Sequence, residues 1–168
     1  NSIASGGNYN VVVGDEAGTA LTTGDANVIL GMGAADAATT SSNSVVIGKG
    51  AVGVGVMTGN ANVVIGTDAG EALTSGNSNI FVGKDVGKAN TTGVQNTAIG
   101  TGALYTNTAS NNTAVGFEAL VDNTTGHTNS AFGQYALANN TTGHGNVAIG
   151  QNCMGGGVQT AESNTAIG

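Results

Sequence analysis

The stretch most suggestive of chemistry is GKGAVG at positions 48–53, which follows the strand-like run SVVI. It satisfies the G-x-G-x-x-G pattern with which dinucleotide-binding proteins hold a pyrophosphate at the start of a helix. The residues that follow, VGVMTGNANVVIG, read as a turn and a further strand. We therefore expect no nucleotide site here, because no helix N-terminus would face the phosphates.

Two histidines and one cysteine are the next candidates for a metal site or a nucleophile. His127 and His144 each follow a TTG turn and lie 17 residues apart, so they would stack on adjacent units of a 17-residue repeat. No carboxylate accompanies them in the sequence, and we expect exposed turn residues and no metal. Cys153 stands where alanine is usual, which predicts a buried and inert side chain.

Acidic side chains are the remaining candidates for catalysis. Asp15, Glu16, Asp68 and Asp85 lie just after the glycines of the repeat, and Glu118 occupies the same column further along. The turn pattern of calcium-binding β-rolls does not recur. No carboxylate cluster of the kind that cleaves polysaccharides is marked. We expect these acidic side chains to be solvated at the corners of the coils, and we expect no cofactor and no enzymatic activity.

The organising feature is the pattern Asn-x-x-x-Gly, which recurs ten times at intervals of 16 to 18 residues, once with Ser for Asn. Each copy suits one strand, and so short a period leaves room for one coil of a solenoid. The fold predicted is an all-β parallel β-solenoid, or β-roll, of about ten 17-residue coils, as a single domain over residues 1–168. The copies are NVVVG 10–14, NVILG 27–31, SVVIG 44–48, NVVIG 62–66, NIFVG 79–83, NTAIG 96–100, NTAVG 112–116, NSAFG 129–133, NVAIG 146–150 and NTAIG 164–168.

Two columns of the repeat exchange volume along the chain. The middle residue of the motif is large in residues 1–89, as at Phe81, and is alanine in residues 90–168. The fourth residue after the motif glycine does nearly the reverse, from Gly87 to Leu104. Because protein interiors are close-packed, we expect both columns to share one core, rich in Val, Ile and Phe in the first half and in Ala and Leu in the second.

The residue before the motif glycine is large and apolar in every copy. Since side chains alternate along a strand, this column faces away from the core and would leave an apolar stripe exposed. We predict that copies of the chain cover it by self-association, most simply as a parallel homotrimer, and end-to-end filaments are a further possibility. The column comprises Val13, Leu30, Ile47, Ile65, Val82, Ile99, Val115, Phe132, Ile149 and Ile167.

Asparagine begins nine of the ten motifs, and on stacked coils these side chains would form an amide ladder. A second set lies seven residues after the preceding motif glycine: Asn90, Asn107, Asn123 and Asn140. Several turn asparagines also match the N-x-Thr glycosylation pattern, although turn chemistry explains them without sugar. The first ladder comprises Asn10, Asn27, Asn62, Asn79, Asn96, Asn112, Asn129, Asn146 and Asn164.

Composition narrows the classes of function. The chain has 168 residues, 30 of them glycine, with three lysines, no arginine and a net charge of −7. This sign of charge disfavours nucleic acid as a partner. One cysteine excludes an intrachain disulfide framework, and no apolar stretch approaches the length of a membrane span.

Residues 96–126, NTAIGTGALYTNTASNNTAVGFEALVDNTTG, resemble the repeats of YadA-like trimeric autotransporter adhesin heads and similar repeats in bacteriophage tail fibres. The likeness is carried by the NTAIG-type strand followed by a small residue, and it extends over almost the entire chain. The resemblance implies a left-handed parallel β-roll with three chains to a rod, displayed outside the cell or on a virion. It supplies no catalytic or binding residues to map.

These observations predict a non-enzymatic structural or adhesive rod of an extracellular surface fibre, filament or phage tail fibre. It would act as a spacer and attachment surface, with an unknown surface receptor that could be a glycan. The alternative is a carbohydrate- or ice-binding solenoid. Ice binding would use T-x-T columns, whereas the turn threonines are adjacent, and carbohydrate binding would use exposed aromatics, for which Tyr105, Phe117 and Tyr135 are the candidates.

Overall fold

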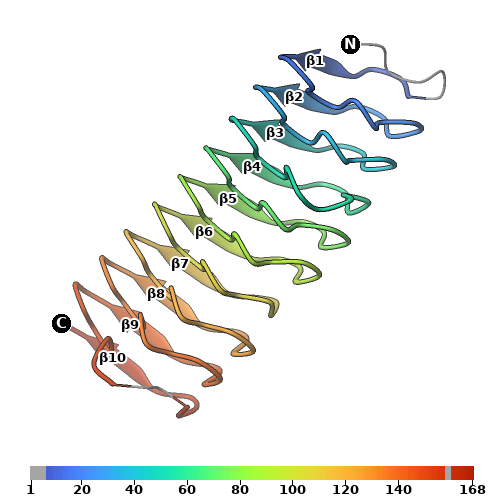
Figure 1. The fold of residues 1–168 in the computed structure, drawn as a ribbon. Coiled ribbons are helices and arrows are strands. Elements are labelled where there is room, and N and C mark those ends of the chain that lie inside the picture. Colours follow the sequence, from blue (N-terminus) through green and yellow to red (C-terminus); the bar gives the residue numbers. More distant parts are fainter. Residues whose placement is uncertain (1–6, 158–159) are drawn as a thin grey trace.

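The computed structural model describes residues 7–157 and 160–168. Figure 1 shows a rod of stacked coils with the two ends of the chain at opposite ends of the stack. The predicted all-β parallel solenoid is confirmed: ten strands pair in chain order in a single sheet and enclose about nine turns. In the described part of the chain, no helix is long and apolar enough to cross a membrane.

One strand begins each coil, and coils are numbered here by their strands. Each strand holds three residues, fewer than the five of the motif, because the flanking asparagine and glycine form corners. The middle residues pair in register from coil to coil, as Val64 does with Phe81. The strands are β1 (Val11–Val13), β2 (Val28–Leu30), β3 (Val45–Ile47), β4 (Val63–Ile65), β5 (Ile80–Val82), β6 (Thr97–Ile99), β7 (Thr113–Val115), β8 (Ser130–Phe132), β9 (Val147–Ile149) and β10 (Thr165–Ile167).

The motif glycine is required at the corner where each strand ends. Gly83 has a φ of +143°, and a Cβ there would lie 2.7 Å from both the carbonyl carbon and the oxygen of Gly100 on the next coil. Both facts exclude a side chain, because an L-residue rarely adopts this φ and the neighbouring backbone cannot yield. The close approach of successive corners therefore sets the stacking of the coils.

The core fills the inside of the coil and is shared by the two columns that exchange volume. Phe81 is fully buried, and a Cβ at Gly87 would lie 2.7 Å from its ring. In the second half Leu104 is fully buried where the strand supplies only Ala98. The large core side chains therefore come from the strands in the first half of the rod and from the turns in the second half. This exchange keeps the core close-packed.

Candidate functional site

The GKGAVG stretch is part of the stack. Gly48 follows β3, and Val52 is a fully buried core residue. The amide of Gly50 donates to the Met32 carbonyl at 3.0 Å, and the amide of Val52 donates to the Ala69 carbonyl at 3.0 Å. These amides join the coil to its two neighbours, so they are not available to a phosphate.

The two histidines stack, as their spacing predicts. Their ring centroids lie 4.7 Å apart, and Nε2 of His144 lies 3.3 Å from a carboxylate oxygen of Glu162. The sequence-based expectation that no carboxylate accompanies them is wrong for His144, because the following coil carries Glu162 to its side. Among the described residues, no group of three or more His, Cys, Asp or Glu side chains is arranged to hold a metal. Cys153 is buried and unpaired within the core.

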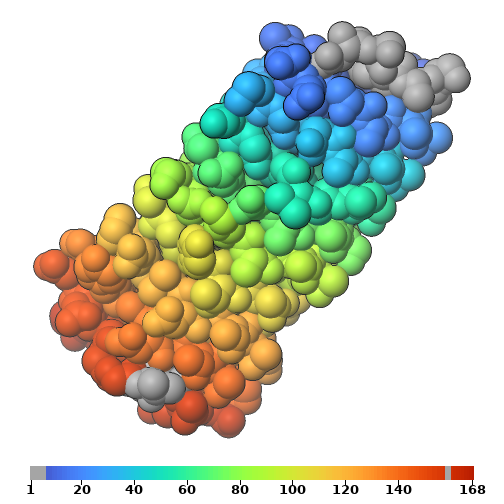
Figure 2. All heavy atoms as spheres, in the orientation of Figure 1, coloured from blue at the N-terminus to red at the C-terminus, as the bar shows by residue number. Residues whose placement is uncertain are grey.

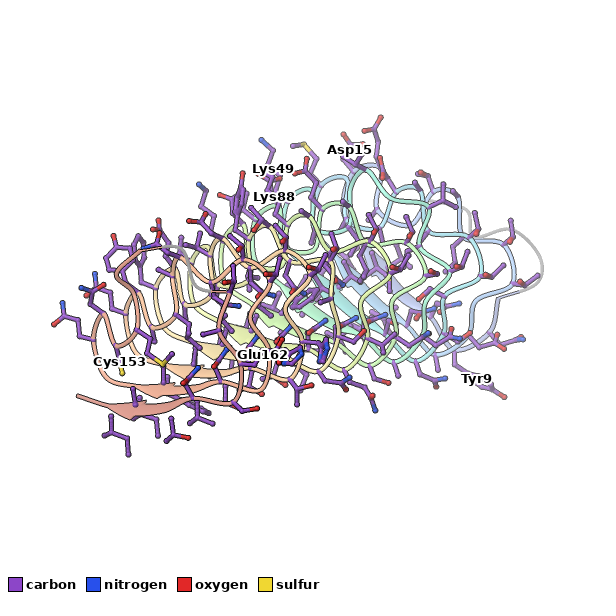
Figure 3. All side chains as sticks on the ribbon, turned by 90° about the horizontal axis from the view of Figure 1, so that it is seen from below. Tyr9, Asp15, Lys49, Lys88, Cys153 and Glu162 are labelled. Atoms are coloured by element: carbon purple, nitrogen blue, oxygen red, sulfur yellow. The ribbon has the colours of Figure 1, made fainter. Side chains whose placement is uncertain are left out.

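The acidic corners differ in their partners. Asp85 lies 2.8 Å from the ammonium group of Lys84 and 2.7 Å from that of Lys88, which also contacts Glu71. The hydrogen bond from Lys84, followed by that from Lys88, lowers the pKa of the Asp85 carboxyl below its ordinary value. Asp68 and Asp85 both adopt positive φ, which places the charged side chains at the turns of their coils. Figure 3 shows Asp15, Lys49 and Lys88 on the side of the rod away from the sheet.

The asparagines that begin the motifs form a ladder through the stack. The Asn79 side-chain oxygen accepts the backbone amide of Asn96 at 3.0 Å, and its side-chain nitrogen donates to Asn62 at 3.1 Å and to the Gly93 carbonyl at 2.9 Å. The same backbone contact links the other coils, with Ser44 standing in for asparagine in coil 3. Because the buried amide groups satisfy one another, the ladder holds the corners in register. Asn10, Asn27, Asn112, Asn129, Asn146 and Asn164 complete it.

The second set of asparagines lies inside the coil. Asn123 donates to the side-chain oxygen of Asn107 at 2.6 Å, and Asn140 donates to that of Asn123 at 2.6 Å. Asn90, Asn123 and Asn140, the asparagines of the NTT sequences, are fully buried. A glycan on any of them is incompatible with the folded coil. Asn111, in the NNT sequence, is exposed.

The column before the motif glycine lies on the outward face of the sheet. Ile99 and Ile149 are 42% and 41% exposed, and Val13 at the N-terminal end of the sheet is 61% exposed. The sequence analysis missed a second column on the same face, made by the first residue of each strand. It is apolar in the first half of the rod, at Val11, Val28, Val45, Val63 and Ile80, and mainly Thr or Ser in the second. The alternation of strand side chains was the signal that could have found it.

We call the two columns together the outward face. It runs the length of the sheet, and no strand residue is charged. Figure 2 shows the coils of the rod in contact along its length, with no break between its two halves. Because the sheet is continuous, the outward face forms one uninterrupted surface.

A groove lies on the turns of coils 5 to 9, and its volume is about 820 Å³. It brings together the three aromatic side chains that the sequence marks, Tyr105, Phe117 and Tyr135. The Phe117 and Tyr135 rings meet edge to face, with centroids 5.4 Å apart and planes at 88°. The Lys88 ammonium lies 5.9 Å from the centre of the Tyr105 ring, and its ion-pair partner Asp85 lines the groove. No strand residue lines the groove, so it lies away from the outward face of the sheet.

Several turn threonines bond between coils. The Thr124 hydroxyl donates to the Thr141 carbonyl at 2.9 Å, and the Thr74 hydroxyl donates to the Thr91 carbonyl at 2.9 Å. These hydroxyls join adjacent coils, so they are engaged within the stack.

Comparison of the chain with protein-family models, with curated proteins and with solved structures finds no match. The likeness to adhesin-head and tail-fibre repeats therefore stays a prediction, and the function has to be argued from the geometry.

Proposed function

We propose that this chain is a non-enzymatic structural rod of an extracellular, cell-surface or virion fibre, and that copies of it associate through the outward face. The observation that carries the proposal is the outward face itself, which is apolar or uncharged along all ten strands. The charged residues all lie outside the strands. This separation is typical of a surface that a partner covers.

The size of the outward face supports association. Ten strands at the usual spacing make a rod about 45 Å long, and two columns of side chains span roughly 10 Å, so the face covers about 450 Å². The apolar part of this area is smaller, because the first residue of the strand is mainly Thr or Ser in the second half of the rod. It still runs the length of the sheet, and apolar patches of a few hundred Å² on monomers are often interaction sites. A second copy of the same chain is the simplest partner, because an identical parallel rod presents columns of the same spacing. A parallel homotrimer closes the arrangement.

The stack suits the role of a spacer. Strands β2 to β9 pair on both sides, and the turns are joined to neighbouring coils by further backbone hydrogen bonds, such as Gly18 to Ala34 at 2.9 Å. Bending the rod would require several of these bonds to break together. Among the described residues, β1 and β10 each pair with a single strand, and pairing at such an edge would join copies end to end. A regular array of turns could then attach to a surface by many weak contacts.

Sedimentation equilibrium of the purified chain tests the association. The wild-type protein is expected to show a trimeric mass, and Ile99→Lys is expected to shift it to the monomer, since a charge would be buried at the interface. Val54→Lys is the matched control: Val54 is 68% exposed and lies on a turn, so this variant should sediment as wild type.

Circular dichroism of each variant shows whether the coil is intact. A wild-type chain that stays monomeric at all concentrations would contradict the proposed association, as would a folded Ile99→Lys variant with the wild-type mass.

A further inference from the structure

We propose that the groove on coils 5 to 9 binds a neutral oligosaccharide, a function beyond that of the self-associating rod. The groove is the place where the regular surface of the repeat is interrupted. Its lining combines three aromatic rings with carboxylates, amides and hydroxyls. A neutral saccharide offers complementary chemistry: apolar C–H faces for the rings, and hydroxyls that both donate and accept hydrogen bonds.

The aromatic side chains come from three successive coils. Tyr105 lies on coil 6, Phe117 on coil 7 and Tyr135 on coil 8. Tyr105 and Phe117 are 37% and 41% exposed, so a large part of each ring is open to a ligand. The edge-to-face contact between Phe117 and Tyr135 fixes both rings before any ligand arrives. Successive coils lie about 4.8 Å apart, a spacing comparable to the repeat of a sugar chain. The Phe117 and Tyr135 planes stand at 88°, so this pair offers a ligand one ring face and one ring edge.

The hollow has a cause in the sequence. Gly102 supplies no side chain in the column that holds Asp85 and Glu118 on the adjacent coils, and the Glu118 side chain leans toward this gap, since a Cβ at Gly102 would lie 3.0 Å from its Cγ. In the column that holds Lys88 and Tyr105, the side chains then become smaller: Val121, Ala138 and Gly155. The resulting volume of about 820 Å³ lies within the range of small-molecule sites and accommodates several sugar rings.

The charges favour a neutral ligand. Of the charged residues that line the groove, Lys84 and Asp85 pair with each other. Glu118 and Asp122 also line it and form no ion pair among the described residues, so their oxygens are acceptors for sugar hydroxyls. They would repel an anionic chain, as would the net charge of −7. A cationic ligand is disfavoured because Lys88 already lies over the Tyr105 ring. Amide groups of Asn139 and Asn152 add donors and acceptors at the far end of the groove.

The test is isothermal titration of the whole chain with linear neutral hexasaccharides: cello-, malto- and N-acetylchito-oligosaccharides. At least one is expected to bind, and Tyr105→Ala and Phe117→Ala should each weaken it by at least tenfold. Tyr9→Ala is the matched control, since Tyr9 is 90% exposed and does not line the groove, and it should leave binding unchanged. Glu118→Gln should weaken binding by a smaller factor, because the amide still accepts a hydrogen bond.

The proposal is overturned if none of these sugars binds, if the aromatic variants bind as wild type, or if choline or trimethyllysine binds in their place. Circular dichroism and sedimentation of each variant are expected to match those of the wild type, because the groove lies away from the sheet. Failure of saccharide binding would therefore leave the proposed association untouched, and the reverse also holds.

Discussion

Replacing one motif glycine by alanine should disrupt the stack far more than one methyl group suggests. Gly83 lies at the middle of the rod with a φ of +143°, and the added Cβ would lie 2.7 Å from the carbonyl carbon and oxygen of Gly100. The unfavourable φ costs about 1–3 kcal/mol. Forcing the neighbouring backbone away costs about 1–3 kcal/mol more. We expect Gly83→Ala to lower the free energy of unfolding by about 4 kcal/mol.

Thermal unfolding followed by far-ultraviolet circular dichroism measures this loss. For a chain of this size, about 4 kcal/mol lowers the midpoint temperature by roughly 8–16 °C. Gly33→Ala is the matched control: its φ is +62°, but no atom lies within 4 Å of the added Cβ. It should cost about 1 kcal/mol, since Asp68 and Asp85 hold a similar φ in the same column. Equal shifts for the two variants at one protein concentration would refute the argument that close corner contacts set the stacking.

Three further predictions concern the ladder, the core and the charged corner. Asn79→Ala should lower the free energy of unfolding in chemical denaturation by about 3 kcal/mol, because the Gly93 carbonyl and the Asn96 amide lose their side-chain partner. Asn77 is exposed, and Asn77→Ala should lower it by less than about 1 kcal/mol. Similar losses for the two variants would argue against the ladder. Gly87→Ala should be less damaging when Phe81 is also changed to Leu, with a coupling of about 1–2 kcal/mol in a double-mutant cycle, and strict additivity would contradict a shared core. The folded pKa of Asp85 is lowered, so its charged form adds stability above about pH 4 that is lost as the pH falls through the folded pKa. Asp85→Asn should therefore remove part of the acid dependence of the midpoint temperature, worth no more than about 1 kcal/mol, and an unchanged acid slope would show that the ion cluster is not stabilising.

The architecture could be predicted because the Asn-x-x-x-Gly motif, with the same buried and exposed positions, recurs ten times. Alternation across the strand predicts which residues face the core, and the exchange between Phe81 and Leu104 predicts that strand and turn share it. The lengths of the strands could not be predicted, since Asn-x-x-x-Gly does not distinguish corner from strand. Likewise, the pattern N-x-Thr marks Asn123 as a glycan acceptor, whereas only the folded coil shows that it is buried.

The groove was harder to predict than the stack. Tyr105, Phe117 and Tyr135 stand five, one and two residues after their motif glycines, so no periodic column unites them. Their convergence depends on the turns of three coils and on the missing side chain at Gly102. Glu162 escaped the sequence analysis for a related reason: its pairing with His144 depends on the path of the last turn. Periodicity predicts the features that all coils share. The groove and the His144–Glu162 pair arise where one coil differs from its neighbours.

Electron microscopy of the purified protein tests the central claim most directly, because it shows length, width and association together. The account predicts straight, stiff rods about 45 Å long, or multiples of that length if copies join end to end, with a width greater than one coil. Round particles, or thin rods no wider than a single coil at every concentration, would contradict it.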